Sequence, residues 1–424
     1  MPMKYSVMYL LKCNEKTVGI EIINDETMET YQVPASEFYK LKGKLENAIV
    51  TVNGVVRGKN KKLPIKKVSE IKNNYSKKIS NYIIMYKDIE VLNFNLLKNT
   101  VKVINKNYLP FGLRRENITP VAVQNWITDR ISNIERTYMN MVYIARCVGR
   151  DNDKVLKDSL GISFTDNFWI KTNDIKVTWP ELKKYRDKND EINKIALTGI
   201  IDSSKNLTKY FTSLFTTKGH FPKAIIGDYI YKLKEDALLE YPAYLIGLQM
   251  GVNVSQCELY GDFVKIRIFT NENKSLVHAS ELKLYYGTDD EIYNIFSQLK
   301  NTNILKQLQR MYIFNYVIGN PDLHDDNYGL LYDSETFKFI SLAPCFDHNV
   351  AFNTEFIGLC RGRLSNSSFI ELDRYAEIFI KYHKDIVEKL EKIDLSEVQK
   401  YLSNRQLKQL KERINNVIKW FYDN

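Results

Sequence analysis

Cysteine is scarce in this chain, and the way it is distributed excludes two classes of protein. The five cysteines are far apart, odd in number and include no C-x-x-C pair. Small extracellular domains carry even, regularly spaced sets, and structural zinc sites use paired cysteines. We therefore expect a reduced, intracellular protein without a zinc framework.

Long apolar runs are also missing. No stretch of 18 apolar residues occurs, and the apolar run in the opening MPMKYSVMYLLKCNEK is too short for a signal peptide. No period of 20 to 50 residues repeats, and no segment is of low complexity. We expect a cytoplasmic globular protein that has no contact with a membrane.

The composition supplies an ordinary core and an excess of positive charge. The 424 residues are 44% hydrophobic and 26% charged, as in folded chains of two or three domains. The net charge of +10 permits binding to nucleic acid or an acidic partner. A general preference for lysine throughout a proteome would give the same net charge without any such partner. The basic stretch VRGKNKKLPIKKVSEIK has no interleaved aromatics, which favours a solvated face or a linker. A patch that binds nucleic acid or an acidic partner is the alternative interpretation.

Hydrophobic patterning divides the chain into four regions. Residues 1–68 alternate apolar and polar positions and predict a small β-rich module, whereas residues 69–194 predict a helical accessory region. Strand patterns dominate residues 195–285 around one helix, ALLEYPAYLIGLQMG, which Gly251 is placed to end. Residues 286–424 are mainly helical, and the apolar stripe of the last helix predicts core packing or, alternatively, a dimer seam.

The segment NPDLHDDNYG, at residues 320–329, interrupts this helical region. Gly319 and the Asn-Pro pair after it force a turn, so residues 322–327 are predicted to form a loop. Two short apolar runs around DSET then predict a β-hairpin, and Asp347 follows it directly.

Three interpretations fit this acidic loop. Turns favour Asp and Asn, so an ordinary polar turn is one of them. A transition-metal site would use His324 with Asp325, Asp326 or His348, but no H-x-x-x-H or H-x-x-E-H spacing is present. The third is the catalytic loop of a phosphoryl-transfer enzyme.

Phosphoryl transfer requires a carboxylate that accepts a proton, and a second carboxylate and an amide that hold Mg²⁺. Kinase loops place the base Asp and the metal-binding Asn five residues apart, with a further metal-binding Asp after a hairpin. Asp322, Asn327 and Asp347 have this arrangement.

A kinase also needs a strand lysine for the nucleotide phosphates. Lys232 lies in the alternating pattern DYIYKLK, although a solvent-facing strand lysine would look the same. Glu240, at the start of the next helix, is a candidate ion-pair partner for Lys232. Alternatively, its negative charge only stabilises the N-terminus of its own helix. The stretch SLFTTKGHFPKA is a candidate phosphate-covering loop, but its single glycine, Gly219, does not match a Gly-rich loop.

In this order, GHFPKA, YIYKLK, EYPAYLIGLQMGVNVS, NPDLHDDNYGLL and LAPCFD resemble the HipA-like kinases, bacterial serine/threonine kinases often found as toxins of toxin–antitoxin pairs. The resemblance covers residues 195–424, and NYLPFGL and LGISFTDNFWIK resemble the N-terminal region of a HipA-like subfamily. It implies an α+β, bilobal protein-kinase-like fold. The β-rich N-lobe would span residues 195–285 and the helical C-lobe residues 286–424, after the small β-rich module and the helical region.

The resemblance assigns catalytic roles in the loop and beyond the hairpin. Asp322 would be the catalytic base and His324 would brace the loop. Asn327 and Asp347 would be the Mg²⁺ ligands. Asp325 and Asp326 are then interpreted as acids that only solvate the loop.

The resemblance also assigns the nucleotide site. Lys232 would hold the ATP phosphates, and Lys223 would lie in the phosphate-covering loop. The backbone of Ile268, Phe269 and Thr270 would face the adenine as a hinge.

Function and partners are expected to follow the family. The resemblance implies an ATP- and Mg²⁺-dependent serine/threonine kinase with a protein substrate, which in family toxins often belongs to the translation machinery. It also implies an antitoxin-type partner, through which contact with DNA would be indirect. A lipid or small-molecule kinase and a nucleotide-binding pseudokinase are alternatives. Family members silence themselves by autophosphorylation of a serine in the covering loop, and here the matching stretch offers Ser213, Thr216 and Thr217.

Overall fold

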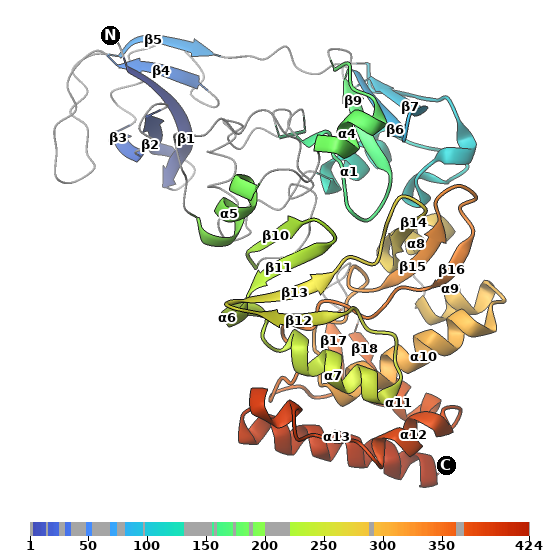
Figure 1. The fold of residues 1–424 in the computed structure, drawn as a ribbon. Helices are drawn as coiled ribbons and strands as arrows, with labels where there is room; N and C mark the ends of the chain where they lie inside the picture. Colours follow the sequence, from blue (N-terminus) through green and yellow to red (C-terminus); the bar gives the residue numbers. More distant parts are fainter. Residues whose placement is uncertain are drawn as a thin grey trace.

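The computed structural model describes residues 81–95, 98–130, 155–156, 159–172, 175–185, 190–199, 221–287, 292–361 and 369–423, and the backbone of five earlier strands. These strands form an antiparallel sheet in the order β3-β2-β1-β4-β5 (Figure 1). Their bounds are β1 (Met3–Cys13), β2 (Lys16–Asn24), β3 (Thr30–Pro34), β4 (Ala48–Val52) and β5 (Val68–Asn73). The strand content predicted for the first 68 residues is confirmed.

A second antiparallel sheet lies where the sequence predicted helices. Its order is β8-β7-β6-β9, with bounds β6 (Asn81–Tyr86), β7 (Ile89–Asn95), β8 (Thr100–Val103) and β9 (Phe168–Thr172). The helical prediction is therefore wrong for these parts of residues 69–194. Every residue of β6 after the first is buried, so the strand has no polar alternation, and periodicity cannot separate such a strand from a buried helix.

Helices also occur in this accessory region. They are α1 (Pro120–Asp129), α4 (Trp179–Tyr185) and α5 (Asp190–Thr198), with short 3-10 turns η2 (Lys106–Tyr108) and η3 (Phe111–Leu113). Helix α1 is capped at its N-terminus by Thr119, whose side chain accepts a hydrogen bond from the backbone N–H of Ala122, and proline occupies the first helical position.

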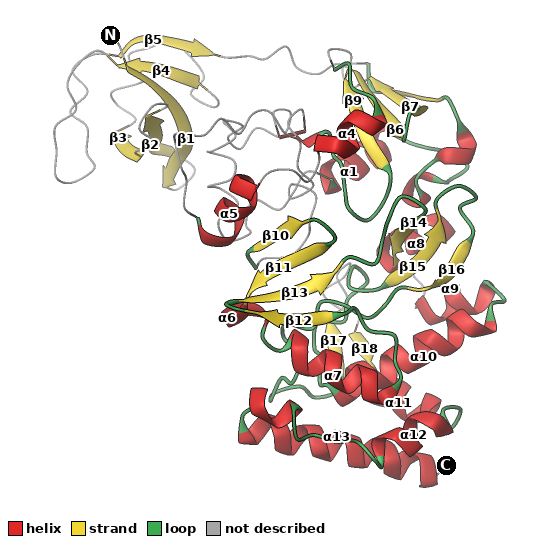
Figure 2. Cartoon of the chain, viewed as in Figure 1, coloured by secondary structure: helices red, strands yellow, loops and turns green. Residues whose placement is uncertain are grey.

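Four of the strands in residues 195–285 form an antiparallel sheet in the order β10-β11-β13-β12 (Figure 2). Its bounds are β10 (Lys223–Ile226), β11 (Tyr229–Leu233), β12 (Cys257–Tyr260) and β13 (Phe263–Arg267), with α6 (Lys234–Ala237) and α7 (Glu240–Met250) between β11 and β12. Helix α7 ends at Gly251, whose φ of 66° is the left-handed conformation that glycine adopts without strain. The predicted helix stop is confirmed.

A three-stranded antiparallel sheet, β14-β15-β16, follows and leads into the helical part of the chain. The strands are β14 (Lys274–His278), β15 (Gly329–Asp333) and β16 (Phe339–Leu342), with a small pair β17 (Leu359–Arg361) and β18 (Phe369–Glu371) further on. The helices are α8 (Ala279–Tyr286), α9 (Ile292–Gln298), α10 (Thr302–Val317), α11 (Leu372–Ile380), α12 (Lys384–Leu390) and α13 (Asn404–Asp423), with the 3-10 turn η5 (Val398–Tyr401). The predicted α+β class, a β-rich lobe followed by a helical lobe, is confirmed.

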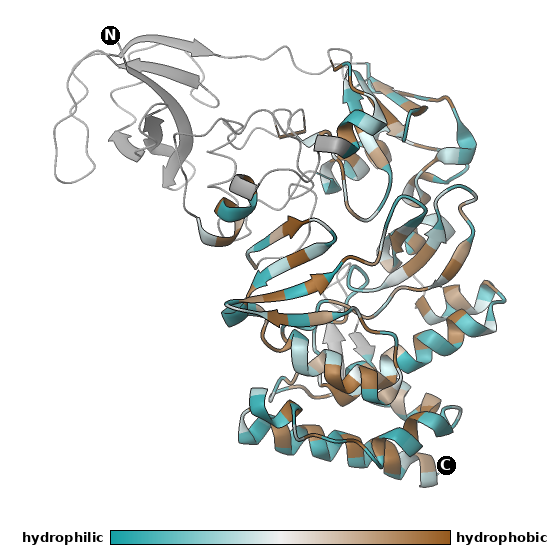
Figure 3. Cartoon of the chain, viewed as in Figure 1, coloured by the Kyte–Doolittle hydropathy of each residue, from teal (hydrophilic) through white to brown (hydrophobic). Residues whose placement is uncertain are grey.

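One hydrophobic core joins the accessory sheet to the C-terminal helices. It runs from Tyr82 and Phe94 to Leu410, Ile414 and Val417 of α13. Figure 3 shows apolar and polar residues alternating along α13, as expected for a helix with one buried face. The predicted core packing of the last helix is confirmed.

Aromatic rings fasten the accessory sheet to the β15–β16 hairpin. The ring of Tyr86 lies 4.8 Å from that of Phe168 and 5.1 Å from that of Phe337, and the ring of Phe111 lies 5.1 Å from that of Tyr332. Such pairs bury large apolar area and add about 0.5–1.5 kcal/mol each beyond burial. None of the helices among the described residues is long and apolar enough to span a bilayer.

Candidate active site

The loop at residues 320–327 begins where α10 ends. Gly319 has a φ of 58°, and a Cβ there would lie 2.6 Å from the guanidinium carbon of Arg413 on α13. The side chain of Asn320 donates to Asn315 Oδ1 at 2.9 Å and accepts from the N–H of Asp322 at 3.1 Å. Glycine is required at the turn, and the amide of Asn320 fixes the direction in which the chain leaves the helix.

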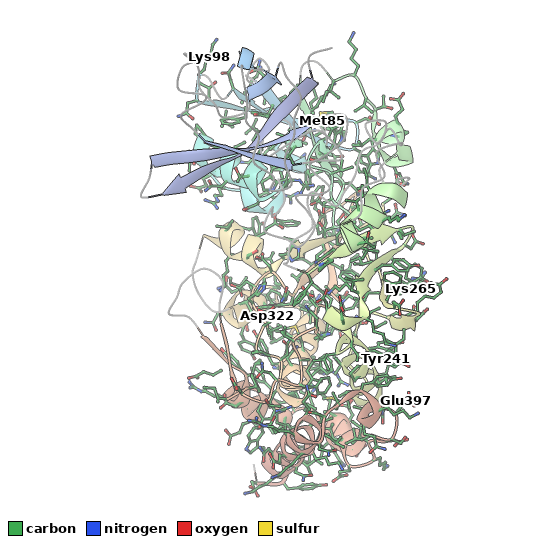
Figure 4. The ribbon with its side chains drawn as sticks, turned by 90° about the vertical axis from the view of Figure 1, so that its left-hand side faces the viewer. Met85, Lys98, Tyr241, Lys265, Asp322 and Glu397 are labelled. Atoms are coloured by element: carbon green, nitrogen blue, oxygen red, sulfur yellow. The ribbon has the colours of Figure 1, made fainter. Side chains whose placement is uncertain are left out.

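Asp322 and Asn327, predicted as base and metal ligand, are bonded to each other. The Asn327 side-chain amide donates to the carbonyl oxygen of Asp322 at 2.7 Å and to its carboxylate at 3.3 Å. His324 lies inside the loop, where its Nδ1 accepts from the N–H of Asp326 at 3.2 Å and its carbonyl accepts from the N–H of Asn327 at 2.8 Å. The carboxylate of Asp322 is half exposed, as a group that receives a proton from a substrate must be. Figure 4 places Asp322 between Met85 of the accessory sheet and Glu397 near the last helices.

Asp325 and Asp326 are buried, which corrects their interpretation as solvated loop acids. Asp325 accepts from Lys283 Nζ on α8 at 2.7 Å and from the Tyr328 hydroxyl at 2.9 Å. Asp326 accepts from the Ser280 hydroxyl at 2.5 Å. Turn preference explains why acids occur here, but only tertiary packing reveals that these two fasten the loop to α8.

Asp347 follows the hairpin, as predicted, and meets the lysine of the preceding sheet. Lys232 Nζ lies 2.7 Å from Asp347 Oδ1 and 2.6 Å from Glu240 Oε1. The other carboxylate oxygen of Glu240 accepts from the backbone N–H of His348 at 3.0 Å. Asp347 has a φ of 63°, a conformation uncommon for residues other than glycine, though Asp adopts it more readily than most. The pairing of Lys232 with Glu240 is confirmed, and a solvent-facing Lys232 is excluded.

These charges perturb one another. Burial alone would lower the pKa of Lys232, but Asp347 and Glu240 outweigh it and raise that pKa above its ordinary value. Burial alone would raise the pKa of Asp347, but Lys232 and Lys223 hold it well below its ordinary value. Burial lowers the pKa of His348, so its imidazole is neutral near pH 7. The site therefore contains a fixed ammonium and a fixed carboxylate across the physiological range.

Lys223 lies on a strand and not in a loop, which corrects the prediction. It is the first residue of β10 and is paired directly with Lys232 of β11. This register places both buried lysines on neighbouring strands. Ser213, Thr216 and Thr217 lie outside the described residues.

A cleft of about 770 Å³ passes over these groups. Of the predicted residues, its lining includes Lys223, Lys232, Ile268, Phe269, Thr270, Asn327 and Asp347. The described lining does not include Asp322, His324 or Glu240. Asp322 and His324 are hydrogen-bonded to Asn327 of the lining, and Glu240 is paired with Lys232. The cleft is of the size typical for small-molecule and cofactor sites.

Residues 215–397 match the family model of the HipA-like C-terminal domain. This part of the chain is therefore similar to the HipA-like C-terminal domain. The match contains both buried lysines, the acidic loop and Asp347, so the whole charged cluster lies within the HipA-like domain. The upstream resemblance lies outside the matched residues and remains a prediction.

Two solved structures resemble this chain at low identity. The Helicobacter pylori proinflammatory kinase CtkA is 17% identical, with a TM-score of 0.34, and the comparison covers 47% of this chain and 90% of that one. HipA of Shewanella oneidensis MR-1, from a toxin–antitoxin complex with HipB and operator DNA, is 12% identical, with a TM-score of 0.47, covering 81% of this chain and 97% of that one. No curated protein shows significant similarity to the chain.

The hinge predicted in the HipA-like domain lines the cleft beside residues that the sequence did not single out. The rings of Phe269 and Phe346 lie 5.5 Å apart. The Thr270 hydroxyl donates to the carbonyl of Phe164, in the accessory region, at 2.5 Å. Phe164 is 106 positions from Thr270, and no local spacing rule connects segments so far apart.

Helix α1 of the accessory region also lines the cleft. Val121, Asn125 and Asp129 contribute to the wall, as does Arg115 just before the helix. The accessory region and the HipA-like domain therefore enclose one cavity together, which none of the sequence patterns indicated.

Proposed function

We propose that this protein is an ATP- and Mg²⁺-dependent serine/threonine protein kinase of the HipA-like type. The observation that carries the proposal is the buried ammonium of Lys232, held between Glu240 at 2.6 Å and Asp347 at 2.7 Å at the wall of the cleft. A lysine ordered by a glutamate and placed beside a metal-binding aspartate is the arrangement that kinases require around the nucleotide phosphates.

The residues of the cleft fit a magnesium-bound nucleotide. Mg²⁺ takes oxygen ligands, typically one or two carboxylates together with substrate phosphates and water. Asn327 and Asp347 supply an amide oxygen and a carboxylate on the same cleft. Among the described residues no group of three His, Cys, Asp or Glu side chains is placed to hold a metal ion, so the transition-metal interpretation of His324 has no support. When bound, Mg²⁺ would neutralise charge on the transferred phosphoryl group.

Each protein group then has one task. Asp322, whose carboxylate is 51% exposed, accepts the proton of the substrate hydroxyl. His324 holds the loop by accepting the Asp326 N–H, and Lys232 binds the phosphates while Glu240 fixes its position. Lys223, whose charge helps to lower the pKa of Asp347, adds positive potential at the phosphate end of the cleft.

The proposed substrate is a protein hydroxyl, with a component of the translation machinery as one candidate, and the proposed partner is an antitoxin-type protein. Contact with DNA would run through that partner, and the net charge of +10 would help such a complex approach DNA. The match of residues 215–397 to the HipA-like C-terminal domain supports this proposal.

Incubation of the purified protein with labelled ATP, Mg²⁺ and a cell lysate tests the proposal. Labelled protein bands are expected, and they should vanish for Asp322→Ala and Asp347→Ala variants that circular dichroism shows to be folded. Label in lipid or a small molecule would instead support the alternative kinases, and nucleotide binding without transfer would indicate a pseudokinase. Retained transfer by folded Asp322→Ala would refute the assignment of the base. Mass spectrometry of the same reaction reads whether Ser213, Thr216 or Thr217 becomes phosphorylated.

A further inference from the structure

The segment at residues 163–166 of the accessory region touches the hinge directly. Besides the bond from Thr270 to the Phe164 carbonyl, the N–H of Leu276 donates to the carbonyl of Thr165 at 2.8 Å. The Asn167 side chain donates to the carbonyl of Glu272 at 2.9 Å. Three hydrogen bonds thus join residues 164–167 to the hinge and to the residues that follow it.

A buried arginine fixes the segment from behind. Arg130, which is 8% exposed, donates twice to the carboxylate of Asp166, with both distances 2.8 Å. It also donates to the carbonyls of Gly161 at 2.8 Å and Phe168 at 2.9 Å, and its guanidinium lies 4.7 Å from the ring centre of Trp126. A planar arginine with this many partners holds both ends of the segment in one position.

Phe164 lines the cleft from this fixed segment. Its side chain is half-buried, and it belongs to none of the hydrophobic clusters that the described residues form. The other two phenylalanines of the cleft, Phe269 and Phe346, already pair with each other. An aromatic ring at a wall of a cleft, outside the core, is suited to contact with a flat base.

We propose that Phe164 forms a wall of the base-binding pocket, so that the accessory region takes part in nucleotide binding. The inference rests on the proposed kinase function, because it takes the cleft to be a nucleotide site. Nucleotide binding then stabilises the contact between the accessory region and the hinge. Phe164 belongs to the accessory region, and its backbone carbonyl is hydrogen-bonded to Thr270 of the hinge.

Isothermal titration calorimetry with ADP, and separately with inorganic tripolyphosphate, tests the inference. Replacement of a stacking ring by alanine is expected to raise the Kd for ADP about tenfold, which corresponds to about 1.4 kcal/mol. Phe164→Ala should leave the affinity for tripolyphosphate unchanged, because that ligand has no base. Phe164→Tyr should restore ADP binding. Phe421→Ala, which removes an equally half-buried ring from α13, serves as the matched control and should change neither affinity.

The outcomes separate this inference from the proposed function. If the wild-type protein does not bind ADP, the proposed function fails. If the wild type binds ADP and Phe164→Ala binds it within twofold, only the role of Phe164 is overturned. If both Phe164→Ala and Phe164→Leu lose the folded state by circular dichroism, Phe164 is a packing residue and the inference is also overturned. In a transfer assay, Phe164→Ala should raise the KM for ATP while changing kcat little.

Discussion

Replacement of Lys232 by methionine removes the cation between two carboxylates. Methionine is unbranched and close to lysine in length, so the side-chain volume is largely retained while the charge is lost. Glu240, which is 4% exposed, then keeps its charge without the ammonium that lies 2.6 Å away in the wild type. The substitution therefore tests stability as well as phosphate binding.

The size of the effect follows from the contacts that survive. Removal of one partner of a buried ion pair costs about 3–5 kcal/mol. Glu240 retains the N–H of His348 at 3.0 Å, and the Asp347 carboxylate is 27% exposed and can be hydrated. Both facts place the expected loss of unfolding free energy near the lower limit, about 3 kcal/mol.

Urea unfolding of the nucleotide-free protein measures this loss. Lys265→Met is the matched control, because Lys265 lies on the neighbouring strand and pairs with a half-exposed Glu258 at 3.5 Å. A pair of that kind is worth less than about 1 kcal/mol. Glu240→Gln should cost less in the Lys232→Met background than in the wild type, because there it removes a carboxylate that has lost its ammonium partner. A Lys232→Met protein as stable as Lys265→Met, or strictly additive double-variant energies, would refute the reasoning.

The pH dependence gives a second measurement of the same cluster. The pKa of Asp347 is lowered in the folded state, so its stabilisation is present above about pH 4 and is lost as the pH falls further. The pKa of Lys232 is raised, so its stabilisation is present below about pH 10 and is lost as the pH rises through the folded-state value. The stability difference between wild type and Lys232→Met should therefore be largest between these limits and shrink outside them.

Three further outcomes are expected. Burial lowers the pKa of His383 to about 4, below its unfolded value near 6.5, so stability should fall as the pH drops from 6.5 towards 4, and His383→Gln should reduce that slope in denaturation at pH 7 and pH 5. Asp325→Ala leaves the Lys283 ammonium without its partner at 2.7 Å and should lower the unfolding free energy by about 3 kcal/mol, whereas a loss below about 0.5 kcal/mol would restore the interpretation of Asp325 as a solvated acid. Gly329→Ala would place a Cβ 2.1 Å from the carbonyl oxygen of Val277, so it should separate β14 from β15 and lower the melting temperature by several degrees, while an unchanged melting temperature would contradict that contact.

Much of the candidate site could be predicted because its parts are consecutive in the chain. Gly319 and the Asn-Pro pair predicted the turn, the apolar runs around DSET predicted the hairpin, and the position of Asp347 follows from them. The alternating residues around Lys232 likewise predicted its strand. Turn and strand preferences act over a few residues, so they can be read without knowledge of the fold.

Predictions failed where burial removed the local signal or where distant segments meet. The strand β6 is apolar on both faces and was predicted as part of a helical region. Asp325 and Asp326 were interpreted as solvated acids because the acceptors of the loop and the donors on α8 are some 40 positions apart. Lys223 was placed in a loop because only its pairing with Lys232 shows that it belongs to the sheet.

The sequence by itself determined which groups this protein brings to its site: a loop with Asp322 and Asn327 five positions apart, an aspartate beyond a hairpin, and a strand lysine. The tertiary structure alone decided how they are used. It placed Lys232 against Asp347, 115 positions away, and it brought Phe164 of the accessory region to Thr270 of the predicted hinge, 106 positions away. Contacts over such separations depend on how the sheets and helices pack, because local backbone preferences extend over only a few residues and carry no information about which distant segment will lie beside them.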